Sequence, residues 1–296
     1  MLKYDYNLNT FSFYNSYTFR IQRINNMLPG NTNNKLSELD SILRDLRSFV
    51  VGFSGGLDSS FLIHRAQMLK RPKFIAVTIH TAFVPEREIR EALEFSSIHK
   101  INHRVLEISI PDEIRNNPAG RCYLCKKVLF SAIVEYAQKN GFRYIVDGTN
   151  ADDKNEYRPG LRALSEMKIR SPLAEAGLTK AEIRQLAQDA GLAIWDKPAM
   201  ACLLTRIPYD SEISEGKLKM IEKAEDYLFE KGFPGTRVRI HGDIARIECI
   251  PGYLSQLVND PEKDSIVTYL KKIGFRYVSL DLEGYRTGSM NSNNLE

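Results

Sequence analysis

The chain has 296 residues, of which 43% are hydrophobic and 26% are charged, and its formal net charge is +4. This size and balance fit a soluble globular protein of about two domains, and no apolar run is long enough to span a membrane. There is no signal-peptide pattern at the N-terminus, so we expect a cytoplasmic protein. Its mild basic excess suits an anionic nucleotide substrate without indicating nucleic acid.

Residues 1–34 are rich in Asn and aromatic side chains and show no clear periodicity. We interpret them as an N-terminal extension, which is either a packing arm or oligomer contact or a poorly ordered tail. Residues 35–205 are expected to form a first domain, residues 206–290 a second, and residues 291–296 a polar tail. The first domain should open with a helix, because Leu and Ile recur at helical spacing over residues 35–48.

The stretch from Phe49 to Ser60 predicts a short apolar strand, a tight glycine loop and a helix. Gly55 and Gly56 allow a positive φ and a close approach to a ligand, and Ser59 and Ser60 occupy expected helix-cap positions. N–H donors gathered at a helix start, together with the helix dipole, predict a phosphate site here, and we name residues 54–59 the phosphate loop. A Walker loop is not indicated, because its glycine-lysine pattern is missing from the sequence.

Strands then alternate with helices, which predicts an α/β fold: a Rossmann-like parallel sheet with helices on both faces. Ligands of such sheets bind beyond the carboxyl ends of the strands. Expected strands are 73–81, 103–110 and 143–146, and expected helices are 85–100, 123–139 and 179–191, the last opened by a capping box of Thr179 and Glu182. Beyond residue 205 we expect a smaller C-terminal α+β domain with helices 214–231 and 261–273 and strands 236–241, 244–249 and 275–282.

Acidic residues occur at two places on the expected ligand edge. Asp58 lies in the phosphate loop, where a carboxylate beside polyphosphate is suited to hold Mg²⁺; the alternative is an aspartate that caps the loop. Residues 147–153 contain an Asp-Gly turn and two further aspartates. Such a turn is often only solvated, but this one ends a predicted buried strand at the ligand edge, so we expect a functional role.

Four cysteines in so long a chain do not make a disulfide scaffold, and in a reducing compartment they indicate metal-binding, catalytic or inert thiols. Cys122 and Cys125 begin a helix on one of its faces, where the helix N-terminus and basic neighbours such as Arg121 should favour the thiolate. The pair suits a redox dithiol, half a zinc site or iron–sulfur ligation. Cys202 and Cys249 lie among apolar residues, where a buried small hydrophobe is the default interpretation.

Several motifs together resemble the LarE family of the PP-loop ATP pyrophosphatase superfamily, whose members cleave ATP to AMP and pyrophosphate. LarE proteins are ATP-dependent sulfur transferases of nickel-pincer nucleotide biosynthesis. The resemblance covers roughly residues 35–290. Its motifs are the phosphate loop, the Asp147–Asp153 turn with Tyr157–Gly160 after it, Trp195–Pro198 before Ala201–Leu203, and the closing Gly284–Ser289.

The resemblance implies that the protein adenylates a carboxylate of pyridinium-3,5-biscarboxylic acid mononucleotide and converts it to a thiocarboxylate. One branch of the family sacrifices the cysteine matching Cys202, whereas another holds a 4Fe–4S cluster on three cysteines. Because this sequence has Cys122 and Cys125 as well, it is similar to the cluster branch. Three thiolates leave one iron open, from which we infer that sulfide bound there attacks the adenylate while Cys202 survives.

The resemblance also implies which residues catalyse the reaction, bind ATP, bind the substrate and hold the cluster. Arg237 and Arg239 alternate on a predicted strand, so both can meet one phosphate; the alternative is a solvated basic strand. Asp58 and Cys202 are expected to be catalytic, and Asp58 also to hold Mg²⁺. The expected ATP-binding residues are Ser54, Gly55, Gly56, Asp58, Ser59, Gly148 and Thr149, the expected substrate-binding residues are Arg206, Glu225, Arg237, Arg239 and Glu248, and the expected cluster ligands are Cys122, Cys125 and Cys202.

Three other functions compete with this interpretation. A cluster-dependent PP-loop tRNA thiolase would want zinc ribbons or a strongly basic face, and the sequence shows neither. An amidating PP-loop enzyme, such as an NAD or GMP synthetase, leaves the three cysteines unexplained. A nucleotide-binding sensor would do no chemistry. We therefore expect a small nucleotide substrate, no nucleic acid or membrane partner, an unassigned sulfide donor, and a homo-oligomer such as a hexamer.

Overall fold

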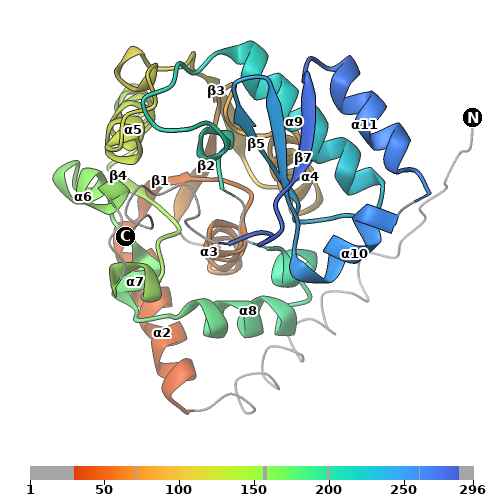
Figure 1. Cartoon of the computed structure of the whole chain (residues 1–296). Helices are drawn as coiled ribbons and strands as arrows, with labels where there is room; N and C mark the ends of the chain where they lie inside the picture. The colour runs from red at the N-terminus through yellow and green to blue at the C-terminus, as the bar shows by residue number, and fades with distance from the viewer. Residues whose placement is uncertain (1–29, 71, 156–158, 199–200, 260, 287–296) are drawn as a thin grey trace, which may run out of the picture.

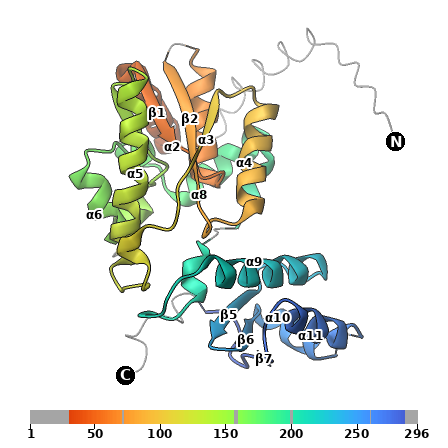
Figure 2. The same ribbon diagram turned by 90° about the horizontal axis from the view of Figure 1, so that it is seen from above.

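The computed structural model describes residues 30–70, 72–155, 159–198, 201–259 and 261–286. Most of the predicted N-terminal extension and the whole predicted tail lie outside these residues. The described chain forms a sheet of four strands and a sheet of three, each packed with helices (Figures 1 and 2). Within these residues, no helix combines the length and the apolar character needed to cross a membrane.

The larger sheet is parallel, with strand order β3-β2-β1-β4, which confirms the predicted α/β fold. Phe49 and Val51 of β1 pack into one core and Val50 into another, so both faces of the strand are buried. This two-sided burial explains why the strand is apolar without alternation. The strands are β1 (Ser48–Gly52), β2 (Lys73–His80), β3 (His103–Glu107) and β4 (Tyr144–Val146).

Helices cover both faces of this sheet, as predicted (Figure 2). α2, α3, α4 and α8 share the core of Phe49 and Val51, whereas α5 and α6 pack against Val50. The helices are α2 (Gly30–Leu46), α3 (Leu57–Met68), α4 (Glu86–Ile98), α5 (Arg121–Lys139), α6 (Pro159–Glu166), α7 (Pro172–Glu175) and α8 (Lys180–Asp189). Short 3₁₀ turns are η1 (Asp112–Ile114), η2 (Asp152–Asn155), η3 (Ala193–Asp196) and η4 (Leu203–Arg206).

The smaller sheet has strand order β5-β6-β7 and belongs to a C-terminal unit that runs from α9 to β7. β5 and β6 form an antiparallel hairpin around Gly242 (φ +58°), and β7 pairs with β6 in parallel. We propose that the boundary between the two domains lies near residue 205. The elements of the unit are α9 (Glu215–Glu230), β5 (Arg237–His241), β6 (Ile244–Glu248), α10 (Pro251–Asn259), α11 (Lys263–Lys272) and β7 (Tyr277–Leu280).

Local sequence signals were right where they were strong. The capping box is present, because Thr179 Oγ1 accepts the Glu182 N–H and the Glu182 carboxylate accepts the Thr179 N–H. The expectation that Ser59 and Ser60 cap α3 is wrong, since Gly56 is the N-cap and both serines lie inside the first turns. α6, α7 and α10 were not expected, because helices of eight, four and nine residues are too short to show a clear apolar period.

Candidate active site

The phosphate loop joins the end of β1 to the start of α3, at the carboxyl edge of the parallel sheet. Gly55 has φ +68°, and a Cβ there would lie 3.0 Å from the Cβ of Ala92, so both conformation and space require glycine. The hydroxyls of Ser54 and Ser59 lie 3.2 Å apart across the loop. Because the N-cap Gly56 has no side chain to bond the first N–H groups of α3, these donors suit a phosphate.

The turn after β4 lies directly against this loop. A Cβ on Gly148 would be 2.9 Å from the backbone nitrogen of Ser59, closer than real Cβ contacts. Asp147 fixes the turn by accepting hydrogen bonds from the hydroxyls of Thr149 (2.5 Å) and Ser171 (2.7 Å). Since β4 pairs with β1, the two predicted halves of the ATP site meet at one edge of the sheet.

We expect Gly148→Ala to lower ATP-dependent AMP release by roughly tenfold to 100-fold, because its methyl group must displace the backbone at Ser59. The measurement is AMP formation by chromatography, with thermal unfolding recorded on the same preparation. Gly216→Ala on α9 is the matched control, since a Cβ there meets no described atom within 4 Å. Equal activity losses in the two variants would show that the close approach does not matter.

Asp58 lies in the first turn of α3, and only one of its two carboxylate oxygens has a hydrogen-bond partner among the described residues. Its Oδ2 accepts a hydrogen bond of 2.6 Å from Lys180, whereas the buried Oδ1 has no partner among the described residues. Burial raises the pKa of Asp58, while the Lys180 ammonium lowers it and the nearby Asp153 raises it. A buried carboxylate oxygen without a partner beside a phosphate loop fits the predicted Mg²⁺ ligand.

Lys180 is a site residue that the sequence did not predict. Asp152 accepts its backbone N–H at 2.7 Å and Asp153 accepts the N–H of Asn150 at 3.1 Å, so these aspartates shape the turn from which Lys180 reaches Asp58. The capping box placed Lys180 at the start of a helix. Nothing in the sequence indicated that this helix end faces the phosphate loop.

Lys197 connects the phosphate loop to the chain that leads to Cys202. Its Nζ donates to the carbonyl of Gly55 at 2.9 Å and lies 2.5 Å from a carboxylate oxygen of Glu91 on α4. In the sequence, Lys197 was only part of a motif preceding Cys202. Because both partners are far away along the chain, their contact with Lys197 could not be foreseen without the fold.

Cys122 and Cys125 lie in the first two turns of α5, and Cys202 precedes η4; we call these three the cysteine group. Cys125 and Cys202 pack against the same hydrophobic cluster, and Cys122 lies three residues before Cys125 on α5, so the three thiols are neighbours. Burial raises the pKa of Cys125 to about 12, and the nearby Cys202 and Cys122 add to the effect. Burial also raises the pKa of Cys202. The expectation of a favoured thiolate, made for Cys122 and Cys125, is therefore wrong for Cys125, because lost hydration outweighs its basic neighbour. Cys249 is fully buried, as its default interpretation predicted.

Arg206 fixes the Cys202 segment (residues 201–206) to the C-terminal unit. Its guanidinium is 1% exposed, makes two hydrogen bonds of 2.9 and 3.0 Å to Glu225, and donates to the carbonyl of Cys202 at 3.1 Å. Glu225 also accepts the N–H of Val238 on β5. Since Arg206 and Glu225 already have internal partners, direct contact of either residue with substrate stays a prediction.

Arg237 and Arg239 share one face of β5, as their spacing predicted. Arg239 donates to Glu248 on β6 at 2.8 Å and to the carbonyl of Thr205 at 2.6 Å, so this face of the sheet meets the Cys202 segment. Both arginines are less than a tenth exposed, which makes the alternative of a solvated basic strand wrong. Their contact with a substrate phosphate stays a prediction.

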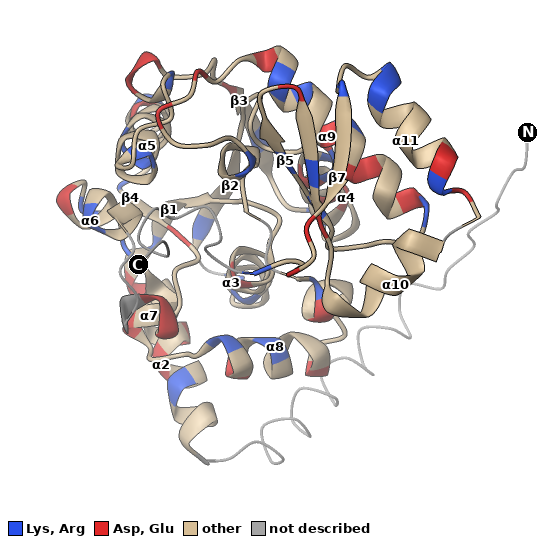
Figure 3. Cartoon of the chain, viewed as in Figure 1, with Lys and Arg blue, Asp and Glu red and all other residues tan. Residues whose placement is uncertain are grey.

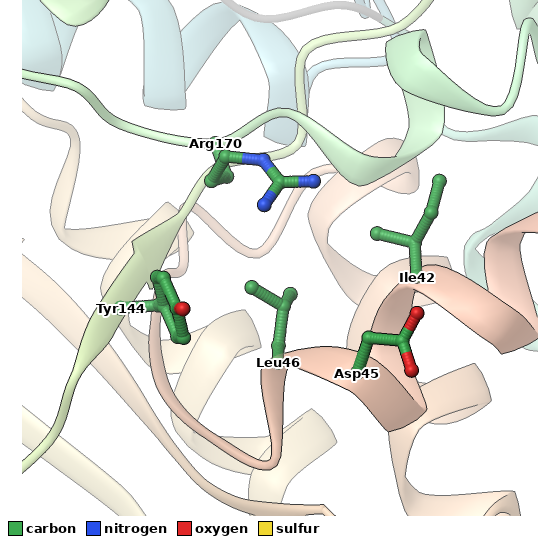
Figure 4. A pocket seen from close by; sticks show the side chains of 5 residues that line it. All are labelled: Ile42, Asp45, Leu46, Tyr144 and Arg170. Atoms are coloured by element: carbon green, nitrogen blue, oxygen red, sulfur yellow. The ribbon is translucent and has the colours of Figure 1, made fainter.

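A small pocket of about 210 Å³ lies elsewhere on the molecule (Figure 4). Tyr144 is the first residue of β4, so the pocket opens near the amino edge of the sheet, away from the phosphate loop. No predicted site residue lines it. Its lining residues are Ile42, Asp45, Leu46, Tyr144 and Arg170.

A family model described as NAD synthase matches residues 43–208, a range that contains the whole parallel sheet, the phosphate loop and the cysteine group. With the parallel sheet and the glycine loop at its carboxyl edge, this match defines an ATP pyrophosphatase of the PP-loop class.

Comparison with curated proteins narrows the class. An uncharacterised protein of Synechocystis sp. is 37% identical over 263 residues, 87% of this chain and 97% of that protein. The pyridinium-3,5-bisthiocarboxylic acid mononucleotide synthase of Lactiplantibacillus plantarum is 36% identical over 260 residues, 87% and 94% of the two chains. The tRNA-specific 2-thiouridylase MnmA of Limosilactobacillus reuteri is 30% identical over 189 residues, but these cover only 50% and 49%. The chain belongs to the LarE family, as its motifs indicated.

Proposed function

We propose that this protein uses ATP to convert a carboxylate of pyridinium-3,5-biscarboxylic acid mononucleotide into a thiocarboxylate, a step of nickel-pincer nucleotide biosynthesis. The activity for which the Lactiplantibacillus relative is named supports this substrate. The observation that carries the proposal is the presence, in one chain, of a phosphate loop and three neighbouring cysteines. An amidating PP-loop enzyme would not need the three cysteines.

In the first step, the phosphate loop and the turn after β4 hold the triphosphate of ATP, and Asp58 binds Mg²⁺ through its unpartnered Oδ1. An oxygen of the substrate carboxylate attacks the α-phosphorus, and the bond to the β-phosphate oxygen breaks. The products are an acyl adenylate and pyrophosphate. Lys180, whose ammonium contacts Asp58 beside the phosphate loop, would supply positive charge to stabilise the leaving pyrophosphate.

The C-terminal unit supplies the substrate side of the site. Arg237 and Arg239 form a pair of guanidinium groups suited to the phosphate of the mononucleotide, with Glu248 orienting Arg239. Arg206, held by Glu225, keeps the Cys202 segment against this face. In the second step, hydrosulfide attacks the carbonyl carbon of the adenylate; the bond to the AMP oxygen breaks, giving the thiocarboxylate, AMP and a proton.

The cysteine group fits a 4Fe–4S cluster by its donor chemistry, because thiolates are the usual ligands of such clusters. Among the described residues, no three Cys, His, Asp or Glu side chains are spaced to bind a single metal ion, whereas in a 4Fe–4S cluster each thiolate binds a different iron. Cys122 and Cys125 on α5 and Cys202 before η4 would hold the cluster. When bound, it would supply one iron without a protein ligand, which is suited to carry the attacking sulfide.

Anaerobic reconstitution with iron and sulfide, followed by counting of product per chain, tests this function. We expect several thiocarboxylates per chain and an intact Cys202 by mass spectrometry, since a cluster-bound sulfide can be replaced after each turnover. Product that stops at one per chain, with dehydroalanine at Cys202, would show sacrificial donation from that cysteine instead.

The partial similarity to a thiouridylase makes tRNA the second candidate substrate. Basic and acidic side chains occur together on α8 and α11 (Figure 3). RNA would favour a face of one sign, so the small nucleotide is the better substrate. A cytoplasmic location stays a prediction from the sequence, a homo-oligomer such as a hexamer stays a prediction from the family, and the sulfide donor stays unassigned.

A further inference from the structure

Arg121, the first residue of α5, is a buried cation outside the predicted site. It is 5% exposed, and its Nε and Nη1 have no hydrogen-bond partner among the residues that the structure describes. Leaving buried charged donors unpaired is costly, so a side chain in this state indicates an interaction that forms only when a ligand is present.

The guanidinium of Arg121 lies beside the cysteine group. Its Cζ is 4.3 Å from the centroid of the Tyr209 ring, so the ring covers one face of the guanidinium plane. Stacking of this kind leaves the in-plane N–H donors available. Arg121 directly precedes Cys122 at the start of α5, and Cys125 of the same helix packs against the same hydrophobic cluster as Cys202, so the arginine lies at the cysteine group.

A contrast with two other buried arginines narrows the chemistry of the ligand. Arg206 pairs with Glu225 and Arg239 pairs with Glu248, at N–O distances of 2.9 and 2.8 Å. In both cases the fold itself supplies a carboxylate to the planar guanidinium. The described chain supplies none to Arg121, so a ligand carboxylate is the matching partner.

We propose that Arg121 binds one carboxylate of a dicarboxylic substrate while the other carboxylate is activated, and thereby selects a diacid over a monoacid. The inference rests on the proposed function, in which the substrate carries two carboxylates. Only one of them becomes an acyl adenylate at a time, and the second keeps its negative charge. Held by Arg121 beside Cys202, this second group turns the activated carbonyl toward the incoming sulfur.

The test measures binding to the anaerobically reconstituted protein without ATP, by isothermal titration calorimetry. The probes are pyridinium-3,5-biscarboxylic acid mononucleotide and nicotinic acid mononucleotide, which has one carboxylate. We expect Arg121→Gln to raise the Kd of the diacid roughly 10- to 100-fold and that of the monoacid less than about threefold. Arg121→Lys keeps the charge without the planar fork and should fall between. Arg115→Gln is the control, since Arg115 is half exposed and already pairs with Asp112.

Iron and acid-labile sulfide are measured on every variant. Loss of iron from Arg121→Gln would mean that the arginine supports the metal cluster, and it would overturn the proposal. Equal weakening of both probes, or no weakening, would overturn it as well. If the unmodified protein does not bind the diacid, the proposed function itself is contradicted. If the diacid binds equally well to the unmodified protein and to Arg121→Gln, only the role of Arg121 is contradicted.

Discussion

Asp58→Asn should lower the release of AMP and pyrophosphate by roughly 1,000-fold, equivalent to about 4 kcal/mol of transition-state stabilisation. Asparagine keeps the size of the side chain but removes the negative charge that we propose holds Mg²⁺ against the phosphates. It also removes the counter-ion of Lys180, whose ammonium lies 2.6 Å from the carboxylate. Release of pyrophosphate in the presence of the mononucleotide substrate is the quantity to measure.

A matched control is available elsewhere in the chain. Asp264 lies, like Asp58, in the first turn of a helix, but it is exposed on α11. Asp264→Asn should retain the activity of the unmodified protein. Circular dichroism and the Tm of both variants separate a lost metal ligand from a lost fold. If Asp58→Asn works within a factor of about ten of the unmodified protein, Mg²⁺ is held by other groups.

Cys202→Ala should abolish sulfur transfer, with a loss of roughly 1,000-fold or more, while ATP activation of the carboxylate continues. The two half-reactions separate because Asp58 and the phosphate loop lie between β1 and the first turn of α3, whereas Cys202 belongs to a segment held by Arg206 and Arg239. Exchange of labelled pyrophosphate into ATP reports the first step, and thiocarboxylate formation reports the second. Iron bound per chain should fall to background in the same preparation.

Cys249→Ala is the control for this variant, because Cys249 is a buried cysteine outside the cysteine group. It should keep both its iron and its product. Loss of pyrophosphate exchange together with product in Cys202→Ala would instead show that the cysteine supports the ATP site. Full iron binding by Cys202→Ala would remove Cys202 from the set of ligands.

Much of the fold was predictable because its signals are local. The apolar run around Val50 and the Thr179 capping box depend on neighbouring residues alone, and the strand–helix alternation then leaves few arrangements for a parallel sheet. α10 carried no such signal. It is a helix of nine residues with a single fully buried position, Leu257, so its helical period could not stand out.

The candidate site was predictable only in part, because its remaining members depend on contacts between distant segments. Gly55 and Asp58 could be placed from a motif. Lys180 and Lys197 could not, since a lysine near a helix start or before a proline is ordinary until the fold brings it to the loop. The charge of Arg121 was visible beside Cys122, but its burial without a partner was not. Burial also reversed the expected ionisation of Cys125.

The chain around Cys202 is held on both sides, by Lys197 on the carbonyl of Gly55 and by Arg206 on Glu225. Because these anchors belong to different parts of the fold, the number of residues between them determines where the sulfur lies. A residue inserted or deleted there moves the thiol relative to ATP even if both anchors still form. At the Gly141 turn after α5, where a Cβ meets no described atom within 4 Å, an added residue leaves the site in place. Under the proposed function, chain length as well as side-chain identity is therefore constrained before Arg206.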